Sequence, residues 1–294
     1  MNLPVRDTVE PLSAAGRFGG RPAAMNLEFA RAPDGLTHIA SQYAAYPFHI
    51  CRPFRYENDP TGMATVYMQS ASGGLYEHER LETTLIANEN ATVHVTSQAS
   101  TIVHEMQGGR AEQIVTLRVE ANAWLEYLPD PLILFPGARV DSRVRLVLAE
   151  GAQAIIADSF LAHDSKAAGR MFDRLNSEVR IEATGGTLLA CDAFAVEGVQ
   201  FRDALALGGR GFATHGSMAM LSATAATDEA LAAIRAQIDS NEECYGGASL
   251  LPNGAGLWVR LVARDGAALK RTMIGVWASM RRSMTGIEPV ARRK

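Results

Sequence analysis

Histidine and carboxylate side chains are the residues of this sequence that could bind a metal ion or transfer a proton. The seven histidines are spread along the chain, and no two have the helical or strand spacing of a metal site. The densest group of such ligands is Glu77-His78-Glu79. On a strand its two carboxylates would face away from the imidazole, so we expect a solvated edge. A weak ion site shared with a neighbouring strand is the alternative.

A second polar set alternates with apolar residues. His94 and Thr96 would lie on the strand face opposite Val93 and Val95, and Glu126 occupies the corresponding position about thirty residues later. Such groups either line a wet channel or face solvent, and the sequence leaves both interpretations open.

The motifs of common enzyme classes are absent from the sequence. It has no GxSxG, Walker, GxGxxG or HExxH pattern. The three cysteines, Cys51, Cys191 and Cys244, are far apart and lack CxxC spacing, which argues against a disulfide framework or a zinc site. We therefore expect a cytoplasmic protein that is not an enzyme.

Charge and hydropathy exclude other classes. The net charge is −4, so no overall field attracts nucleic acid or an anionic membrane, and no apolar run is long enough to cross a bilayer. We expect no nucleic-acid and no membrane partner. The C-terminal basic residues are interpreted as a solvated terminus. They are Arg281, Arg282, Arg292, Arg293 and Lys294.

A repeated strand pattern must position these polar groups. Four twelve-residue segments align without gaps: 84–95, 116–127, 145–156 and 180–191. Position two is always a branched apolar residue, and position seven is Asn or Gly, which tolerate the positive φ of tight turns. Each unit is thus a strand, a turn and a strand that hide one side. The starts recur about every thirty residues, as in stacked repeats.

The pattern predicts a mainly β, β-solenoid-like fold of two layers of mostly antiparallel strands. A chance pattern in a β-rich chain is the alternative. Residues 1–24 have no periodicity and are predicted to be a flexible leader before a single β-rich domain, 25–294. Its C-terminal subregion, about 225–288, is predicted to contain two helices, 227–239 and 267–284, and a strand at Leu257–Ala263.

The second of these helices carries an apolar stripe on one face. Such a stripe is more often core than interface, but its methionines and tryptophan favour an interface more than usual. The stripe residues are Leu269, Met273, Val276, Trp277, Met280 and Met284.

Several segments, taken in order, carry a resemblance to a known family. They are Phe48-His49-Ile50-Cys51-Arg52-Pro53-Phe54, Ser72-Gly73-Gly74-Leu75 with Arg80-Leu81, Val95-Thr96-Ser97-Gln98-Ala99-Ser100-Thr101, Leu125-Glu126-Tyr127-Leu128-Pro129, Phe135-Pro136-Gly137-Ala138, and Leu269 to Gly286, which ends in Arg281-Arg282-Ser283-Met284-Thr285-Gly286. These segments cover roughly residues 25–288, and it is their order and spacing together that are specific. Together they resemble the urease accessory protein family UreD, also called UreH.

The resemblance implies a solenoid-like, non-enzymatic scaffold that bridges apo-urease to UreF, which carries the GTPase UreG. A homodimer within that larger complex is also expected. The family implies a wet passage for Ni²⁺, which would be transient cargo rather than a bound cofactor. We assign Glu79, His94 and Glu126 to that path. The residues expected to face UreF are Leu269, Met273, Trp277, Met280, Arg281 and Arg282.

Two departures from the family pattern bear on the nickel path. Glu77-His78-Glu79 stands where the family usually has Gly-Gly-Asp, and Arg170 stands where it usually has Glu. An arginine there would repel Ni²⁺ unless Asp173 or Glu178 compensates. The alternative function is a stand-alone β-solenoid or sandwich that binds protein or carbohydrate. Exposed Trp124 and Tyr127 would then form its platform.

Overall fold

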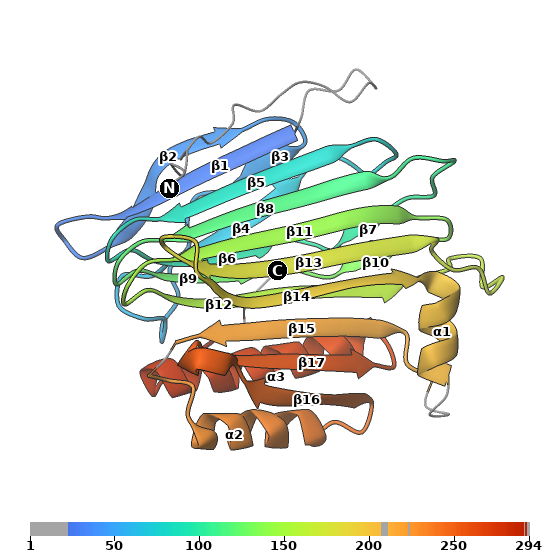
Figure 1. The fold of residues 1–294 in the computed structure, drawn as a ribbon. Helices are drawn as coiled ribbons and strands as arrows, with labels where there is room; N and C mark the ends of the chain where they lie inside the picture. Colours follow the sequence, from blue (N-terminus) through green and yellow to red (C-terminus); the bar gives the residue numbers. More distant parts are fainter. Residues whose placement is uncertain (1–22, 207–210, 223, 291, 293–294) are drawn as a thin grey trace, which may run out of the picture.

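The computed structural model describes residues 23–206, 211–222, 224–290 and 292. Its strands form two stacked sheets, and helices α2 and α3 pack with the strands that extend the second sheet (Figure 1). The strand order is β14-β13-β11-β8-β5-β1-β2 in the first sheet and β16-β17-β15-β12-β9-β6-β4-β3 in the second. The mainly β, two-layer, solenoid-like fold expected from the sequence is confirmed.

Three coils of chain build the centre of both sheets, each placing one strand in the first sheet and the next strand in the second. Neighbouring coils pair in parallel. The expectation of mostly antiparallel strands is therefore wrong here, because each turn carries the chain across to the other sheet instead of back beside itself. The strands are β5 (Arg80–Ala87), β6 (Thr92–Ser97), β8 (Ala111–Val119), β9 (Trp124–Leu128), β11 (Arg139–Leu148) and β12 (Gln153–Ala162).

The register of these strands follows the sequence repeat. Equivalent repeat positions are direct neighbours, so the branched residues at position two stack in one row between the sheets. In the first sheet Thr84, Thr116, Arg145 and Arg180 are successive partners. In the second sheet Val93, Leu125 and Ala154 are successive partners.

The turns between the two sheets use the predicted left-handed residues. Asn90, Asn122 and Gly151 have φ of 61°, 56° and 71°. Asn90 N also donates to the Ala121 carbonyl at 3.1 Å, which links one turn to the turn of the next coil. The turns therefore stack in the same way as the strands.

The fourth repeat folds differently. β13 (Arg174–Ala183) and β14 (Leu188–Glu197) form an antiparallel hairpin within the first sheet, with Gly186 at φ 89° in the turn. The winding therefore stops at this unit. At the other end of the sheets the chain supplies β1 (Ala23–Arg31), β2 (Thr37–Ala44), β3 (Phe48–Ile50) and β4 (Ala64–Ser70). The short strands β7 (Thr101–Val103) and β10 (Leu132–Leu134) pair in parallel with each other, and β10 pairs with the end of β12 in the second sheet.

The C-terminal third extends the second sheet and adds the helices. Both predicted helices are present as α2 (Asp228–Asp239) and α3 (Gly266–Thr285), and the predicted strand is β17 (Leu257–Ala263). Thr227 and Asp265 cap the two helices, and Gly286 ends α3 at φ 73°. The sequence did not predict α1 (Gly198–Ala206) or β16 (Cys244–Leu250); β15 (Thr214–Leu221) and a 3-10 turn at Pro252–Gly254 complete the chain.

Two apolar cores lie on the two faces of the second sheet. Leu85, Leu117 and Leu146 belong to the core between the sheets. Ile155, Ile234 and Trp277 belong to the core between the second sheet and the helices. The side chains of β6, β9 and β12 therefore alternate between the first sheet and the helices. A third apolar cluster includes Phe160 of β12 together with Val103, Leu134 and Val140.

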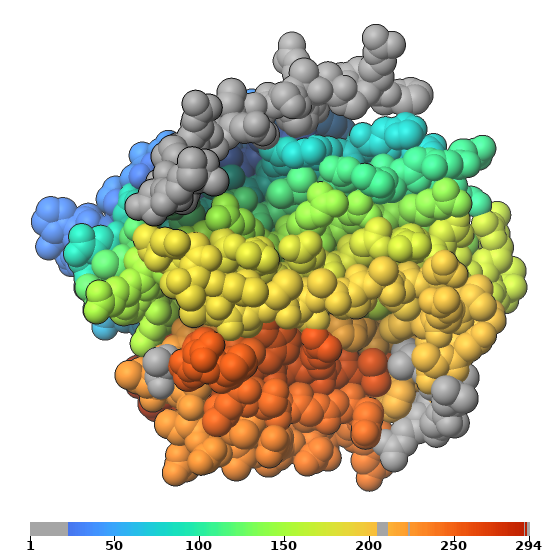
Figure 2. All heavy atoms as spheres, in the orientation of Figure 1, coloured from blue at the N-terminus to red at the C-terminus, as the bar shows by residue number. Residues whose placement is uncertain are grey.

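Figure 2 shows the successive coils as adjacent bands, with the C-terminal part against the last of them. Of the predicted leader, residues 1–22 lie outside the described residues, and Ala23 and Ala24 begin β1. In the described part of the chain no helix has both the length and the apolar character needed to cross a bilayer.

Candidate functional site

Glu126 and His94 lie at the centre of a buried charged cluster between the second sheet and α3. Glu126 is 0% exposed and His94 is 2% exposed, so the interpretation that they face solvent is wrong. The Nδ1 atom of His94 lies 2.6 Å from Glu126 Oε2, which also accepts from Trp277 Nε1 at 3.1 Å. The structure thus brings together two of the three residues assigned to the nickel path.

Arg281 from α3 completes the pairing of Glu126. Its Nε donates to Oε1 at 2.9 Å and its Nη2 to Oε2 at 2.7 Å, a bidentate geometry. Its Nη1 reaches Asp59 at 2.5 Å, and Arg292 binds the same Asp59 oxygen at 2.8 Å. We call Asp59, His94, Glu126, Arg281 and Arg292 the latch cluster.

The latch cluster holds its charges in balance. Burial alone would raise the pKa of Glu126, but Arg281 and His94 outweigh it and lower the pKa to about 2. Burial lowers the pKa of His94, although its bond to Glu126 opposes that shift. With His94 neutral, the two carboxylates match the two guanidinium groups.

Arg281 and Arg292 correct the interpretation of the basic C-terminus as solvated. The Arg281 side chain is 0% exposed and that of Arg292 is 7% exposed, whereas Arg282 is exposed and pairs with Glu288. Arg293 and Lys294 lie outside the described residues. One sequence signal was available: Arg281 follows Trp277 by four residues and so lies on the apolar stripe.

The residues expected to face UreF are mostly inside the protein. Leu269, Trp277, Met280 and Arg281 are buried, and Met273 is half-buried against the same core. Only Arg282 is open to a partner, which could reach the others only by displacing α3. The apolar stripe of this helix is thus core in the folded chain.

Glu79 is apart from the latch cluster, at the start of β5 in the first sheet. Its carboxylate accepts from the Tyr76 backbone N at 2.9 Å and so closes a turn. Glu77 accepts from the backbone N atoms of Gln107, Gly108 and Gly109, which lowers its pKa. These two carboxylates organise loops.

Arg170 is compensated chiefly by Glu105, and of the residues considered from sequence Asp173 adds only a smaller electrostatic contribution. Its Nη2 atom pairs with Glu105 at 2.5 Å, and its backbone N donates to Asp164 at 3.0 Å. Asp173 pairs instead with Arg139 at 2.8 Å. The arginine therefore lies in an exposed, neutralised loop.

A second polar region, missed by the sequence analysis, lies between the two sheets. Gln113, Ser142 and Ser177 are register neighbours on successive strands of the first sheet. Asp158 and Ser217 are register neighbours on the second sheet. Asp158 accepts from Ser177 Oγ at 2.8 Å across the gap, so the two rows face each other. We call these five residues the polar seam.

Asp158 is the carboxylate of the polar seam, and it forms no ion pair with any described residue. Burial is the main cause that raises the pKa of Asp158, and Asp192 adds to it. Burial and the charge of Asp158 also raise the pKa of Tyr127. His215, near one end, has its pKa lowered to about 4 by burial and by Arg260. Asp158 still keeps part of its surface accessible.

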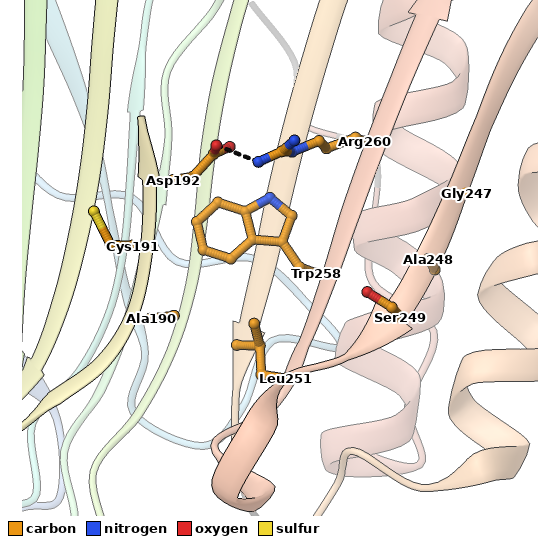
Figure 3. Close-up of a pocket in the computed structure, with 9 residues that line it drawn as sticks. All are labelled: Ala190, Cys191, Asp192, Gly247, Ala248, Ser249, Leu251, Trp258 and Arg260. Carbon is orange, nitrogen blue, oxygen red and sulfur yellow. Dashed lines mark hydrogen bonds and ion pairs between the residues drawn. The ribbon is translucent and has the colours of Figure 1, made fainter. Parts of the chain in front are cut away.

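The polar seam ends near a groove of about 420 Å³ between β14 and the strands β16 and β17. Figure 3 shows Asp192 and Arg260 joined across this groove, with the Trp258 ring beside them. Trp258 Nε1 donates to Ser217 Oγ at 2.7 Å, which connects the groove lining to the polar seam. An ion pair therefore stands where the space between the sheets meets solvent.

No compact metal centre accompanies these regions. Among the described residues, no group of three or more His, Cys, Asp or Glu side chains is placed to hold a metal ion.

A signal for the polar seam was present in the repeat, because Gln113, Ser142 and Ser177 each precede an aligned segment by three residues. That equivalence becomes visible only once the register is known.

The fold and its two polar regions define a two-sheet β-solenoid with a helical C-terminal part and a polar interior. Residues 21–294 match the family model described as UreD urease accessory protein. The chain belongs to the UreD urease accessory protein family, and this membership supports a role in urease maturation.

The sequences of several relatives align with nearly the whole chain. A urease accessory protein UreD 1 of Methylorubrum populi is 38% identical over 286 residues, which is 97% of this chain and 95% of the relative. UreD 1 of Pseudomonas syringae pv. tomato is 35% identical over 274 residues, 93% and 96% of the two chains. UreD 2 of Streptomyces griseus is 31% identical over 292 residues, 96% and 95%.

Proposed function

We propose that this protein is a cytoplasmic, non-catalytic scaffold that bridges apo-urease to UreF and UreG and lets Ni²⁺ pass between its sheets. The observation that carries the proposal is the family match over residues 21–294. The polar seam supports the nickel part, because carboxylate, amide and hydroxyl oxygens bind such a cation without trapping it.

We place the nickel path in the polar seam rather than at Glu79, His94 and Glu126. Both Glu126 oxygens already accept hydrogen bonds, and Arg281 and Arg292 would repel an incoming cation. Asp158 has one hydroxyl donor from Ser177 and lies away from those arginines, across the second sheet. A carboxyl with a raised pKa can exchange its proton for a metal ion.

We also place the UreF-facing surface on the exposed side of α3 and on the residues that directly follow it. Ile274 and Ile287 are each 44% exposed, and Lys270 and Arg282 lie on the same open part of the chain. Exposed isoleucines beside cations are typical of the centre and rim of an interface. Any homodimer would form within the complex through its partners.

Co-expression tests the scaffold role. The chain is expressed with and without the urease subunits, UreF and UreG, and co-purification and urease activity are measured. We expect recovery of these partners and a urease that is inactive when the chain is missing. Urease of unchanged activity without the chain, with no partner recovered, would contradict the proposal.

Substitution separates the surface from the scaffold. Ile274→Asp combined with Ile287→Asp should abolish UreF recovery. Val199→Asp, at a 52% exposed valine of α1, is the matched control and should leave UreF bound. Equal UreF recovery from both variants would exclude this side of α3 as the docking surface.

The carbohydrate-binding alternative loses the residues that motivated it. Trp124 is 8% exposed and Tyr127 is 2% exposed, so they form no surface platform. Trp124 faces the latch cluster, with its ring 6.0 Å from the Arg281 guanidinium carbon, and Tyr127 faces the polar seam.

A further inference from the structure

Asp59 holds two guanidinium groups with one carboxylate oxygen. Arg281 reaches Oδ1 from α3 at 2.5 Å, and Arg292 reaches it from beyond the helix at 2.8 Å. Asp59 Oδ2 has a weaker contact of 3.4 Å with Thr65 Oγ1. Arg281 is anchored independently by Glu126, whereas Asp59 is the carboxylate that binds Arg292.

Two aromatic rings enclose the Arg292 guanidinium. Its carbon lies 4.7 Å from the ring centre of Tyr56 and 5.2 Å from that of Trp277, which is cation–π distance. Neither ring depends on Arg292 for its position. The Tyr56 hydroxyl bonds that of Tyr67 at 2.8 Å, and Trp277 Nε1 bonds Glu126. Each wall of the pocket is therefore held by a contact other than the one to Arg292.

The charge balance of the latch cluster requires a cation at this position. Without Arg292, the carboxylates of Asp59 and Glu126 would face the single guanidinium of Arg281, leaving one uncompensated negative charge. A buried, uncompensated carboxylate is costly. A planar cation between two rings removes that cost better than a compact ammonium does, because it stacks and donates at once.

Arg292 fills the pocket incompletely. Its Nε and Nη1 atoms are buried and have no hydrogen-bond partner among the described residues, and the same holds for His94 Nε2 and Trp124 Nε1 in the same region. Unsatisfied buried donors weaken the hold on this side chain. The position is therefore suited to exchange of its occupant.

We propose that Asp59, Tyr56 and Trp277 form a guanidinium-binding site, which Arg292 occupies from within the same chain and which a second guanidinium group, such as an arginine of a partner protein, can occupy in its place. This site goes beyond the proposed function and does not depend on nickel transfer. A second guanidinium group that binds this site would therefore displace Arg292.

Chemical rescue tests the site. Arg292→Ala leaves the pocket empty, and its melting temperature is measured with increasing ethylguanidinium or ethylammonium at millimolar concentrations. We expect a lowered melting temperature that ethylguanidinium restores in a saturable way, with a clearly smaller effect of ethylammonium. The parent chain, whose pocket is occupied, should respond weakly to either cation.

Matched variants decide between a site and a general salt effect. Arg271→Ala removes an exposed arginine of α3 that pairs with Glu243, and it should show no saturable rescue. Asp59→Asn combined with Arg292→Ala should abolish rescue. Tryptophan fluorescence follows the same titrations, because Trp277 forms a wall of the pocket. The proposal is overturned if Arg292→Ala shows no saturable response, if both cations act equally, or if rescue survives without the Asp59 carboxylate.

Discussion

The latch cluster and the polar seam are both buried and polar, yet they differ in how their carboxylates are satisfied. Glu126 accepts from three side chains and has a pKa lowered to about 2. Asp158 accepts from the Ser177 hydroxyl and from the Ser159 backbone N–H, and burial raises its pKa. The first arrangement uses charge to fix where α3 lies. The second leaves a carboxylate that pairs with no cationic side chain among the described residues. A fully paired buried carboxylate thus indicates a structural role. An incompletely paired carboxylate between the two sheets marks a candidate path for a cation.

The largest effect is expected from breaking the latch cluster. Arg281→Ala leaves Glu126 and Asp59 buried with only Arg292 nearby, and we expect a loss of about 3–5 kcal/mol in the free energy of unfolding. Urea unfolding measures it. Arg271→Ala, an exposed pair on the same helix, should cost at most about 1 kcal/mol. Equal losses would show that the buried pairing has no special weight.

A double substitution sharpens the same point. Glu126→Leu with Arg281→Met removes one charge of each sign and leaves Asp59 paired with Arg292. Because buried pairs can be replaced by apolar residues of similar size, most of the lost stability should return, to within about 1–2 kcal/mol of the parent. A double variant as unstable as Arg281→Ala alone would contradict charge balance as the cause.

Acid should destabilise the end of the polar seam through His215. The pKa of His215 in the folded chain is about 4, below the ordinary histidine value of 6.5, so the unfolded chain takes up the proton first. The contribution of neutral His215 is therefore complete above pH 6.5 and falls as the pH drops toward 4. The resulting loss in the free energy of unfolding is on the order of 3 kcal/mol. His215→Leu should flatten unfolding free energy against pH in that window, and exposed His38→Leu should not.

Substitutions in the turns of the coils should have a smaller effect on the free energy of unfolding. Gly151 has φ 71°, and a Cβ there would lie 2.6 Å from Asn122 Oδ1 of the neighbouring turn. Gly151→Ala should cost about 1–2 kcal/mol in unfolding free energy. Asn122→Gly, which removes that neighbour and permits the same φ, should stay within about 0.5 kcal/mol. A reversed order would show that turn geometry does not limit these coils.

The sequence predicted the coils well because its signals there are local. Position seven of each repeat needs a residue that tolerates positive φ, and Asn90, Asn122 and Gly151 supply it. The register found in the structure follows the gapless alignment of the repeats. The alignment could not predict that the strands pair in parallel, because a strand, turn and strand pattern is the same whether the turn returns within a sheet or crosses to another. β16 was missed because Gly246 and Gly247 lower its strand propensity.

The candidate sites were less accessible from sequence because they depend on contacts between distant residues. Glu126 and Arg281 are 155 residues apart, and Asp59 and Arg292 are 233 apart. Alternation showed that Glu126 faces away from Leu125, but not that α3 covers that face. Asp158 gave no local signal, since its importance comes from Ser177 across the gap between the sheets.

Nickel content of urease tests the central contrast most directly. Urease and its accessory proteins are co-expressed with the parent chain, with Asp158→Asn, or with Asp173→Asn at an exposed carboxylate as control. Nickel per urease active site is then measured by mass spectrometry. We predict that Asp158→Asn keeps the chain folded, with unchanged or slightly higher stability near pH 8, and keeps its partners bound, but lowers nickel content several-fold. The control should match the parent. Fully loaded urease in the Asp158→Asn strain would contradict the assignment of the polar seam as the path.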